Sequence, residues 1–216
     1  MQPNDDAFGP GYFTGLYGVI PSQTWADRSR DDLISRLVAQ HDGPARGLPL
    51  LDLGCGYGYL LQRFHGRYQL FGADISPHAV QVAASRLPDA TFTTADAEQS
   101  LPFPMLFQVI LLVNVLEHLA HPARAVDRLH AALRPGGLCL VHLPTINNPL
   151  NRIYYRYSYA KDSTHVFRPS GAQVTRLFEG GGFELLKDSY APHSPTRLWR
   201  ALKPFPPFVG VYRRRP

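Results

Sequence analysis

The sequence predicts an α/β protein built on a doubly wound, mostly parallel β-sheet, and three observations lead to this fold class. Short apolar runs alternate with helical patterns between residues 49 and 143, as parallel strands joined by crossover helices require. The run 109–113 is apolar throughout, which suits a strand buried on both faces. The run 49–53 stops at a glycine-rich stretch, and a helical pattern follows at once, which is typical of a ligand-binding loop at the end of a strand.

Length and composition are those of one folded domain. The 216 residues are 44% hydrophobic and 18% charged, which argues against disorder over most of the chain. We find no run of about 18 apolar residues, so no membrane span is expected. The first six residues are polar and acidic, unlike a secretory signal, and we expect the protein to be cytoplasmic.

Cysteine usage and charge add two expectations. Cys55 and Cys139 are expected to be free thiols in a reducing compartment. The net charge of +5 is modest, and three arginines at 213–215 contribute much of it. Such a short basic tail is usually solvated and does not establish an anionic partner. Nothing in the sequence indicates the oligomeric state.

Residues 1–45 are expected to form an N-terminal lid segment and a helix. The first 23 residues mix glycine, proline and aromatic side chains, which argues against a regular helix but supplies surface that needs burying. This segment is expected to fold over the mouth of a ligand site, or else to remain a frayed arm. A helix then runs from Thr24 to about His41 and ends at Asp42-Gly43-Pro44.

Residues 46–203 are expected to contain the sheet. The expected strands are 49–53, 68–73, 91–94, 109–113 and 138–143, and the expected helices are 58–65, a helix capped by Ser76 and Pro77, and 122–133. Ser170 and Gln173 form a capping box for a further helix that ends at Gly180-Gly181-Gly182. The last, antiparallel strands are expected at 183–190 and near 198–202. Residues 204–216, which are basic and rich in proline, are expected to be a surface strap.

The glycine-rich stretch is the clearest sign of function. Gly54, Gly56 and Gly58 lie on alternate positions, and glycine there accepts positive φ and lets backbone N–H groups approach a ligand. The dinucleotide fingerprint G-x-G-x-x-G needs a glycine at position 59, where this chain has Tyr59. The spacing therefore argues against a nicotinamide or flavin dinucleotide.

Residues 51–58, Leu-Asp-Leu-Gly-Cys-Gly-Tyr-Gly, resemble the first motif of class I S-adenosylmethionine-dependent methyltransferases, and the likeness extends from about residue 50 to 183. The resemblance implies a Rossmann-like fold, with a seven-stranded, mostly parallel sheet, helices on both faces and an antiparallel last strand. It implies S-adenosyl-L-methionine as cofactor. Asp74 would hold the ribose hydroxyls, and Asp96 with a neighbouring backbone N–H would cap the adenine.

The residues expected to bind the cofactor share a position at the carboxyl ends of consecutive strands, where ligands of such sheets bind. They are Asp52, Gly54, Cys55, Gly56, Gly58, Asp74, Ile75, Asp96, Ala97 and Asn114. Asp52 lies inside a strand and is expected to brace the glycine loop through hydrogen bonds. For Asp74 and Asp96 the alternative is an ordinary acid near a helix, and Cys55 is not expected to be a nucleophile.

Two histidines are candidates for catalysis. Residues 114–119, Asn-Val-Leu-Glu-His-Leu, resemble a segment of the ubiquinone and menaquinone methyltransferases, which implies that His118 lies near the sulfonium. An imidazole of pKa near 6.5 can accept a proton from an acceptor hydroxyl or amine. His165 is a second candidate, and either histidine could instead be structural. Glu117, His118 and His121 lack a partnering cluster, so no metal site is predicted.

An aromatic and basic insertion is expected over about 145–168, where the resembling enzymes build substrate specificity. Tyrosines interleave with arginines there, which allows two interpretations. In one, a helix buries its aromatic rings and exposes its cations. In the other, the rings stack on nucleic-acid bases and the cations pair with phosphate. The first is favoured because no long basic face accompanies the tyrosines.

The chemistry that the resemblance implies is in-line displacement of a methyl group onto a small-molecule acceptor, most simply at oxygen or nitrogen, with carbon and sulfur acceptors also open. We find no nucleophile motif G-x-S-x-G, no phosphate-binding Walker loop and no paired-cysteine zinc signature, and this chemistry requires none of them. The sequence also lacks Asn-Pro-Pro-Tyr after the fourth strand, which argues against a DNA or protein-glutamine substrate. Two alternatives remain open. The chain could be an RNA-modifying methyltransferase, or a protein that binds S-adenosylmethionine without catalysis and acts as a partner.

Overall fold

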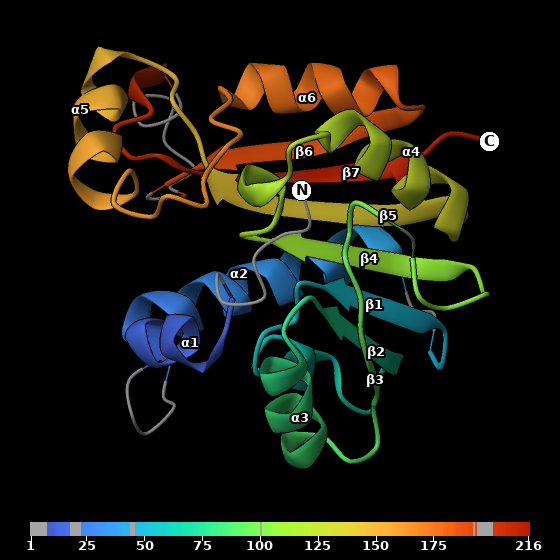
Figure 1. Cartoon of the computed structure of the whole chain (residues 1–216). Helices are drawn as coiled ribbons and strands as arrows, with labels where there is room; N and C mark the ends of the chain where they lie inside the picture. The colour runs from blue at the N-terminus through green and yellow to red at the C-terminus, as the bar shows by residue number, and fades with distance from the viewer. Residues whose placement is uncertain (1–7, 18–22, 44–45, 100, 192, 194–200) are drawn as a thin grey trace.

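The computed structural model describes residues 8–17, 23–43, 46–99, 101–191, 193 and 201–216. They form a single seven-stranded sheet in the order β3-β2-β1-β4-β5-β7-β6 (Figure 1). The strands are β1 (Pro49–Leu53), β2 (Gln69–Asp74), β3 (Thr91–Thr94), β4 (Phe107–Val113), β5 (Leu133–Pro144), β6 (Phe183–Tyr190) and β7 (Pro207–Arg214). Strands β1 to β5 pair in parallel, and β7 is antiparallel to both of its neighbours. The predicted fold class is confirmed.

Strand β1 lies at the centre of the parallel part, with Leu50 in register with Leu70 of β2 and Val109 of β4. All five of its residues are buried. The next strand in sequence after β1 lies on one side of it and β4 on the other, so the order reverses between β1 and β4. In such sheets this reversal opens a crevice at the carboxyl ends of the strands.

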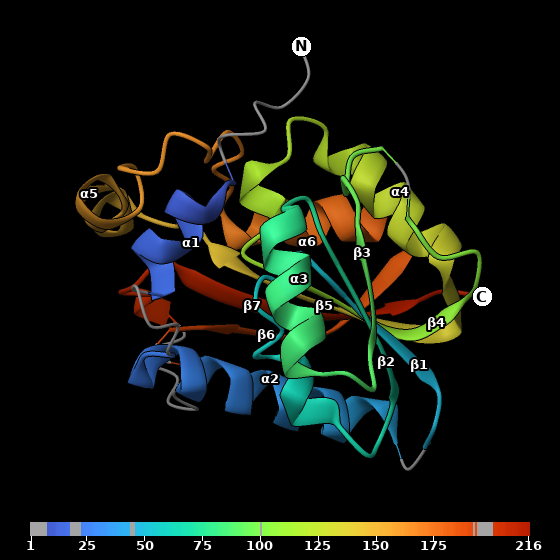
Figure 2. The same cartoon turned by 60° about the horizontal axis from the view of Figure 1, so that its bottom comes forward.

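Helices cover both faces of the sheet. Figures 1 and 2 show α4 (Pro122–Ala132) and α6 (Gly171–Gly180) on one side and α2 (Trp25–Asp42) on the other. Side chains of α4 and α6 belong to one hydrophobic cluster, and those of α2 belong to a second. The two capping boxes begin α2 at Thr24 and α6 at Ser170, and the Ser76 hydroxyl caps α3 (Pro77–Arg86). None of the described helices combines the length and apolarity that a membrane span needs.

Two local expectations about helices are wrong. The N-terminal segment contains a regular helix, α1 (Pro10–Tyr17), although its glycines argued against one. Its Phe13 is only 5% exposed, so tertiary burial outweighs the weak helix propensity. The helix expected over 58–65 is a single 3₁₀ turn, Leu61–Phe64, whose first and last residues are buried. The apolar spacing was genuine, but it supports only one turn.

The surface strap expected after Pro204 is also wrong. Strand β7 runs between β5 and β6, and its Phe208, Val211 and Tyr212 are fully buried. The arginines of β7 led to the prediction of a solvated tail. In the structure they bond to neighbouring backbone instead, because Arg213 donates to the His41 carbonyl at 3.0 Å and Arg214 donates to the Leu133 carbonyl of β5. Of the strand expected near 198–202, residues 198–200 lie outside the described residues, and 201–202 are helical.

Candidate functional site

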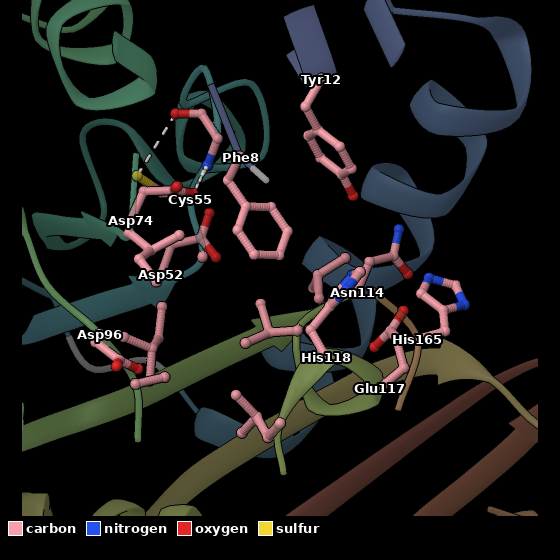
Figure 3. Close-up of a pocket in the computed structure, with 18 of the residues that line it drawn as sticks. Phe8, Tyr12, Asp52, Cys55, Asp74, Asp96, Asn114, Glu117, His118 and His165 are labelled. Atoms are coloured by element: carbon pink, nitrogen blue, oxygen red, sulfur yellow. Dashed lines mark hydrogen bonds between the residues drawn. The ribbon is translucent and has the colours of Figure 1, made fainter. Parts of the chain in front are cut away.

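A cavity of about 890 Å³ opens at the carboxyl ends of β1 to β4. It brings together most of the residues predicted from the sequence (Figure 3). Those that line it are Asp52, Gly54, Cys55, Gly56, Asp74, Ile75, Asp96, Ala97, Asn114, His118 and His165. Gly58 is the one predicted site residue that does not. Three aspartates lie toward one end of the cavity and both histidines lie toward the other (Figure 3).

The loop after β1 has the backbone that its glycines predict. Gly54 has φ +80°, and a Cβ there would come within 2.1 Å of the Val115 side chain, so any larger residue would clash as well as strain the backbone. The N–H groups of Gly54 and Cys55 both donate to the carbonyl of Ala73 in β2, at 2.7 and 3.0 Å. Gly58, with φ +75°, packs on Ala83 of α3. Its role is therefore close packing of the loop on α3.

Asp74, at the end of β2, is held by the glycine loop. Its carboxylate accepts the Gly56 N–H at 2.8 Å and the Ser76 N–H at 2.9 Å. The side chain is 7% exposed, and burial raises its pKa while these backbone bonds oppose the rise. Because each carboxylate oxygen has two lone pairs, Asp74 keeps acceptor capacity on the cavity side. This geometry fits a carboxylate that holds two sugar hydroxyls.

Asp52 lies in β1, one residue before the end of the strand. Its Oδ1 has no hydrogen-bond partner among the described residues, so the expected bracing of the glycine loop is not seen for this atom. The side chain is 2% exposed, and burial, with Asp31 and Asp74 nearby, raises its pKa to about 8. A buried carboxyl with an unpartnered oxygen, on a residue that lines the cavity, suits a cationic ligand group. The methionine ammonium of the implied cofactor is such a group.

The third aspartate, Asp96, follows β3. Its Oδ1 accepts the Glu98 N–H at 2.8 Å, and its Oδ2 accepts from the Gln99 side chain at 3.1 Å. The neighbouring Ala97 is buried. Asp52, Asp74 and Asp96 thus lie at or near the carboxyl ends of three adjacent strands, Asp52 one residue before the end of β1. These three aspartates are therefore compatible with binding of S-adenosylmethionine, the cofactor that the resemblance implies.

Asn114 lies where β4 ends, in a conformation that few residues adopt. Its φ is +55°, its N–H donates to the His142 carbonyl, and its Oδ1 lies 2.9 Å from His142 Nδ1. Burial lowers the pKa of His142 well below its usual value, so this imidazole is neutral and donates to Asn114. Asparagine tolerates the left-handed conformation better than most residues. The bond to His142 holds its side chain at the cavity.

At the other end of the cavity, a chain of hydrogen bonds holds His118. Its Nδ1 lies 2.8 Å from Thr164 Oγ1, and Thr164 in turn donates to Asp162. Since the threonine proton goes to Asp162, the threonine oxygen accepts from His118 Nδ1–H. This bonding leaves Nε2 without a proton. Burial, and then His165, lower the pKa of His118 to about 4.

His165 lies beside His118, with ring centroids 4.7 Å apart. Its Nδ1 lies 3.0 Å from the Tyr155 hydroxyl, and its Nε2 is 3.7 Å from Asp162. Glu117, 1% exposed, has a carboxylate oxygen without a hydrogen-bond partner in the described structure, and burial raises its pKa to about 8. The sequence predicted no metal site, but the fold brings His165 to Glu117 and His118. One potential ligand atom from each lies within 4.8 Å of the others.

The N-terminal segment, which was expected to fold over a ligand site, and the insertion both supply cavity residues beyond the predicted cofactor and catalytic residues. Phe8 contacts the His118 ring edge-on at 5.5 Å, and the Tyr12 hydroxyl donates to Asp162 at 3.3 Å. Tyr159, from the insertion, also lines the cavity. The signal for the first two was the aromatic spacing in an otherwise glycine-rich segment. Cys55, by contrast, is buried, and its thiol pKa is raised well above the usual value, which disfavours a nucleophile.

Comparison with known proteins agrees with this geometry. The sequence profile of a family described as "Methyltransferase domain" matches residues 23–188. A tRNA U34 carboxymethyltransferase of Hahella chejuensis is 33% identical over 162 residues, covering 68% of this chain and 48% of that protein. A ubiquinone biosynthesis O-methyltransferase of Nitrobacter winogradskyi is 36% identical over 171 residues, covering 69% and 61%. The chain spans about half the length of the first curated relatives it matches.

Solved structures share the fold at low sequence identity. Magnesium protoporphyrin IX methyltransferase of Synechocystis, with bound SAH, has a TM-score of 0.72 at 15% identity, and 97% of each chain is covered. The [4+2]-cyclase SpnF has a TM-score of 0.69 at 19% identity, with 89% of this chain and 83% of that chain covered. At these identities the likeness shows the architecture alone.

Proposed function

Because the chain belongs to the class I S-adenosylmethionine-dependent methyltransferases, we propose that it transfers a methyl group to an oxygen or nitrogen atom of a small-molecule acceptor. The observation that carries this proposal is that one cavity has aspartates and a glycine loop at one end and an oriented imidazole at the other. S-adenosylmethionine, the methyl donor of this family, supplies an electrophilic methyl group and a neutral leaving group. The protein therefore has mainly to position and desolvate the reacting atoms.

At the cofactor end, the proposal assigns one role to each acid. Asp74 holds the ribose hydroxyls, Asp96 with the backbone near Ala97 holds the adenine, and Asp52 faces the methionine ammonium. Asn114 and Ile75 complete this end, and the glycine loop, whose N–H groups at Gly54, Cys55 and Gly56 are bonded within the protein, contributes the close approach of its backbone. The buried, unpartnered Oδ1 of Asp52 supports the proposal, because a cation would remove the cost of burying that carboxyl.

At the acceptor end, His118 accepts the proton of the attacking hydroxyl or amine. Thr164 and Asp162 select the tautomer in which Nε2 is free to do so, and burial keeps the ring neutral at physiological pH. His165 packs against this ring as a second acceptor-facing group. We assign no metal ion to this step, so we expect full activity in the presence of EDTA. A requirement for a divalent cation would instead make Glu117, His118 and His165 the metal ligands.

The second candidate is an RNA acceptor, which the tRNA U34 carboxymethyltransferase relative and the tyrosines of the insertion favour. Tyr154 and Tyr157 are exposed rather than buried, so the expectation that this helix buries its aromatic rings is wrong for these two. Exposed tyrosines beside arginines can stack on bases. The small-molecule reading is preferred because the cavity, not the surface, carries the oriented imidazole. Two buried free thiols fit a reducing compartment such as the cytoplasm.

The experiment that tests the proposal measures transfer of a labelled methyl group to two pools, a metabolite and lipid extract and total RNA. Calorimetry with S-adenosylhomocysteine first tests the cofactor site. We expect binding, with label in the extract. Label in RNA alone would make the chain an RNA methyltransferase, and binding without an acceptor in either pool would favour a non-catalytic partner protein. No binding would remove the premise of all three readings.

A further inference from the structure

Helix α5 (Pro149–Ser158), in the insertion, turns an apolar face outward. Leu150, Ile153, Tyr154 and Tyr157 follow the i, i+3, i+4, i+7 spacing of one helix face, and they are 60%, 57%, 43% and 69% exposed. The opposite face holds the buried Asn151 and Tyr155. An amphipathic helix normally faces its apolar side to the core. Here the outer side is the apolar one.

A segment far along the chain extends this apolar surface. Phe205, 40% exposed, contacts the Tyr154 ring at a centroid distance of 5.6 Å, and Leu202 is 52% exposed. The Asn148 side chain donates to the Leu202 carbonyl at 2.9 Å, which ties the segment to the start of α5. We call the six side chains Leu150, Ile153, Tyr154, Tyr157, Leu202 and Phe205 the α5 patch. A contiguous apolar patch of this kind marks an interaction surface.

The exposed charged side chains of α5 and of the loop that follows it are all cationic. Arg152 and Arg156 are exposed on α5 itself, and Lys161 and Arg168 are exposed on the loop that follows. Asp162 is the single acid between residues 145 and 170 in the sequence. Its carboxylate is engaged by Thr164 and Tyr12 at the cavity. The part of the rim that α5 and this loop form is therefore cationic.

We propose that the α5 patch docks on an anionic lipid bilayer and that the methyl acceptor is carried by that bilayer. Aliphatic and aromatic side chains enter the interfacial region, while flanking arginines pair with lipid phosphates. A second copy of the chain would oppose cations to cations. RNA would use the tyrosines and arginines but would gain little from Leu150 and Ile153, which cannot stack on bases as rings do.

The position of the α5 patch relative to the cavity connects docking to catalysis. Ser158, the last residue of α5, lines the cavity together with Tyr159 and Asp162 from the turn that follows. The same short element thus presents the patch outside and forms part of the acceptor end inside. An acceptor with a lipid anchor can then reach His118 from the bilayer surface. This second half of the inference depends on the proposed function, whereas docking does not.

Flotation of the full chain with vesicles tests the docking. One set of vesicles contains phosphatidylcholine and phosphatidylglycerol in equal parts, and the other contains phosphatidylcholine alone. We expect the protein to float with the first set and at least ten times less with the second. The double variant Ile153→Asp/Tyr157→Asp should lose at least ten-fold of the binding, and Arg152→Glu/Arg156→Glu should lose it in the same way. Leu106→Asp, at an exposed apolar residue outside the patch, is the matched control and should bind like the parent chain.

Circular dichroism and S-adenosylhomocysteine calorimetry on each variant show that the fold and the cofactor site are kept. Equal flotation of the patch variants and the control would overturn the proposal, as would flotation that does not depend on anionic lipid. Loss of RNA binding in the patch variants, without vesicle binding by the parent, would assign the patch to RNA. Vesicle binding by a chain that binds no cofactor would leave docking intact and overturn the proposed function.

Discussion

At the scale of single residues, the cavity contains buried carboxyl groups whose pKa values are raised and an imidazole whose pKa is lowered. Burial is the common cause. It raises the pKa values of Asp52 and Glu117 to about 8 and lowers that of His118 to about 4. Each group is thereby moved toward its uncharged form in the absence of a ligand.

Asp74→Ala should weaken S-adenosylhomocysteine binding by about 1–3 kcal/mol, because two hydroxyl bonds to a charged acceptor are lost. Titration calorimetry measures this change. Asp89→Ala is the control, since that side chain is 85% exposed and lies away from the cavity lining. Unchanged affinity in Asp74→Ala would show that the carboxylate serves only to hold Gly56 and Ser76.

Thr164→Val tests whether the hydrogen bond to His118 sets its tautomer. We expect kcat to fall about 10-fold, as the loss of one hydrogen bond near 1.4 kcal/mol would give. His118→Gln should lower kcat further, by about 10²-fold or more, as the loss of a general base does. Cofactor affinity should hold in both variants, and Thr164→Ser should recover the parent rate. If Thr164→Val changed the KM for the acceptor and left kcat alone, a tautomer role would be excluded.

Glu117→Gln tests the buried carboxyl through the pH dependence of stability. The folded pKa of Glu117 is raised to about 8, above its ordinary value near 4.5, so the folded chain keeps a proton that the unfolded chain loses. The stability this proton confers is full below pH 4.5 and declines as the pH rises toward 8. We therefore expect the unfolding midpoint in urea to fall less steeply between pH 6 and 9 in Glu117→Gln than in the parent. Parallel curves would place the Glu117 carboxyl in contact with water or an unseen partner.

At the scale of elements, strand β7 shows how a short segment near the end of the chain completes the sheet. Without it, β6 would have no strand beside it in the described structure, since β7 pairs with both β5 and β6. The ring of Phe208 is fully buried in the same hydrophobic cluster as the side chains of α4 and α6. The segment after Pro204 thus belongs to the core of the domain.

Phe208→Ala should therefore lower the free energy of unfolding by about 3–5 kcal/mol, the range for removing a buried aromatic ring. Urea denaturation followed by circular dichroism measures it. Phe205→Ala, three residues earlier and 40% exposed, is the matched control and should change stability by less than about 1 kcal/mol. Similar small losses in both would support the strap that the sequence suggested.

At the scale of the whole molecule, the cavity joins parts that are distant in the sequence. The glycine loop and Asp74 come from the first half of the sheet, Asn114 and His118 follow β4, and His165 comes from the insertion. The bond from Tyr12 to Asp162 links the N-terminal helix to that insertion over 150 residues. A ligand that fills this cavity contacts both sides of the switch between β1 and β4.

Such a ligand should stabilise the chain as one unit. S-adenosylhomocysteine at 100 times its dissociation constant should raise the free energy of unfolding by about 2.7 kcal/mol, as linkage requires for a ligand bound only by the folded state. Urea unfolding with and without the ligand, followed by tryptophan fluorescence and circular dichroism, measures this rise. Two separate transitions in the presence of the ligand would contradict a site built across the sheet.

The glycine loop, the alternation of strands and helices and the capping residues could be predicted from the sequence because each depends on chemistry within a few neighbouring residues, and the family resemblance pointed to Asp74 and Asp96. Glycine spacing, side-chain caps and apolar periods act over one or two turns of chain. These local patterns predicted the fold class, and of the site residues expected from them and from the family resemblance all but Gly58 line the cavity.

The tertiary structure alone decided the partners of His118, the approach of His165 to Glu117, the core position of β7 and the outward face of α5. Thr164 lies 46 residues from His118, and β7 enters the sheet between strands that precede it in the chain. No local period encodes such contacts, since they depend on which surfaces the rest of the fold leaves to be covered. Because such contacts cannot be predicted locally, Arg213 and Arg214 were wrongly expected to be solvated, and Tyr154 and Tyr157 of α5 were wrongly expected to be buried.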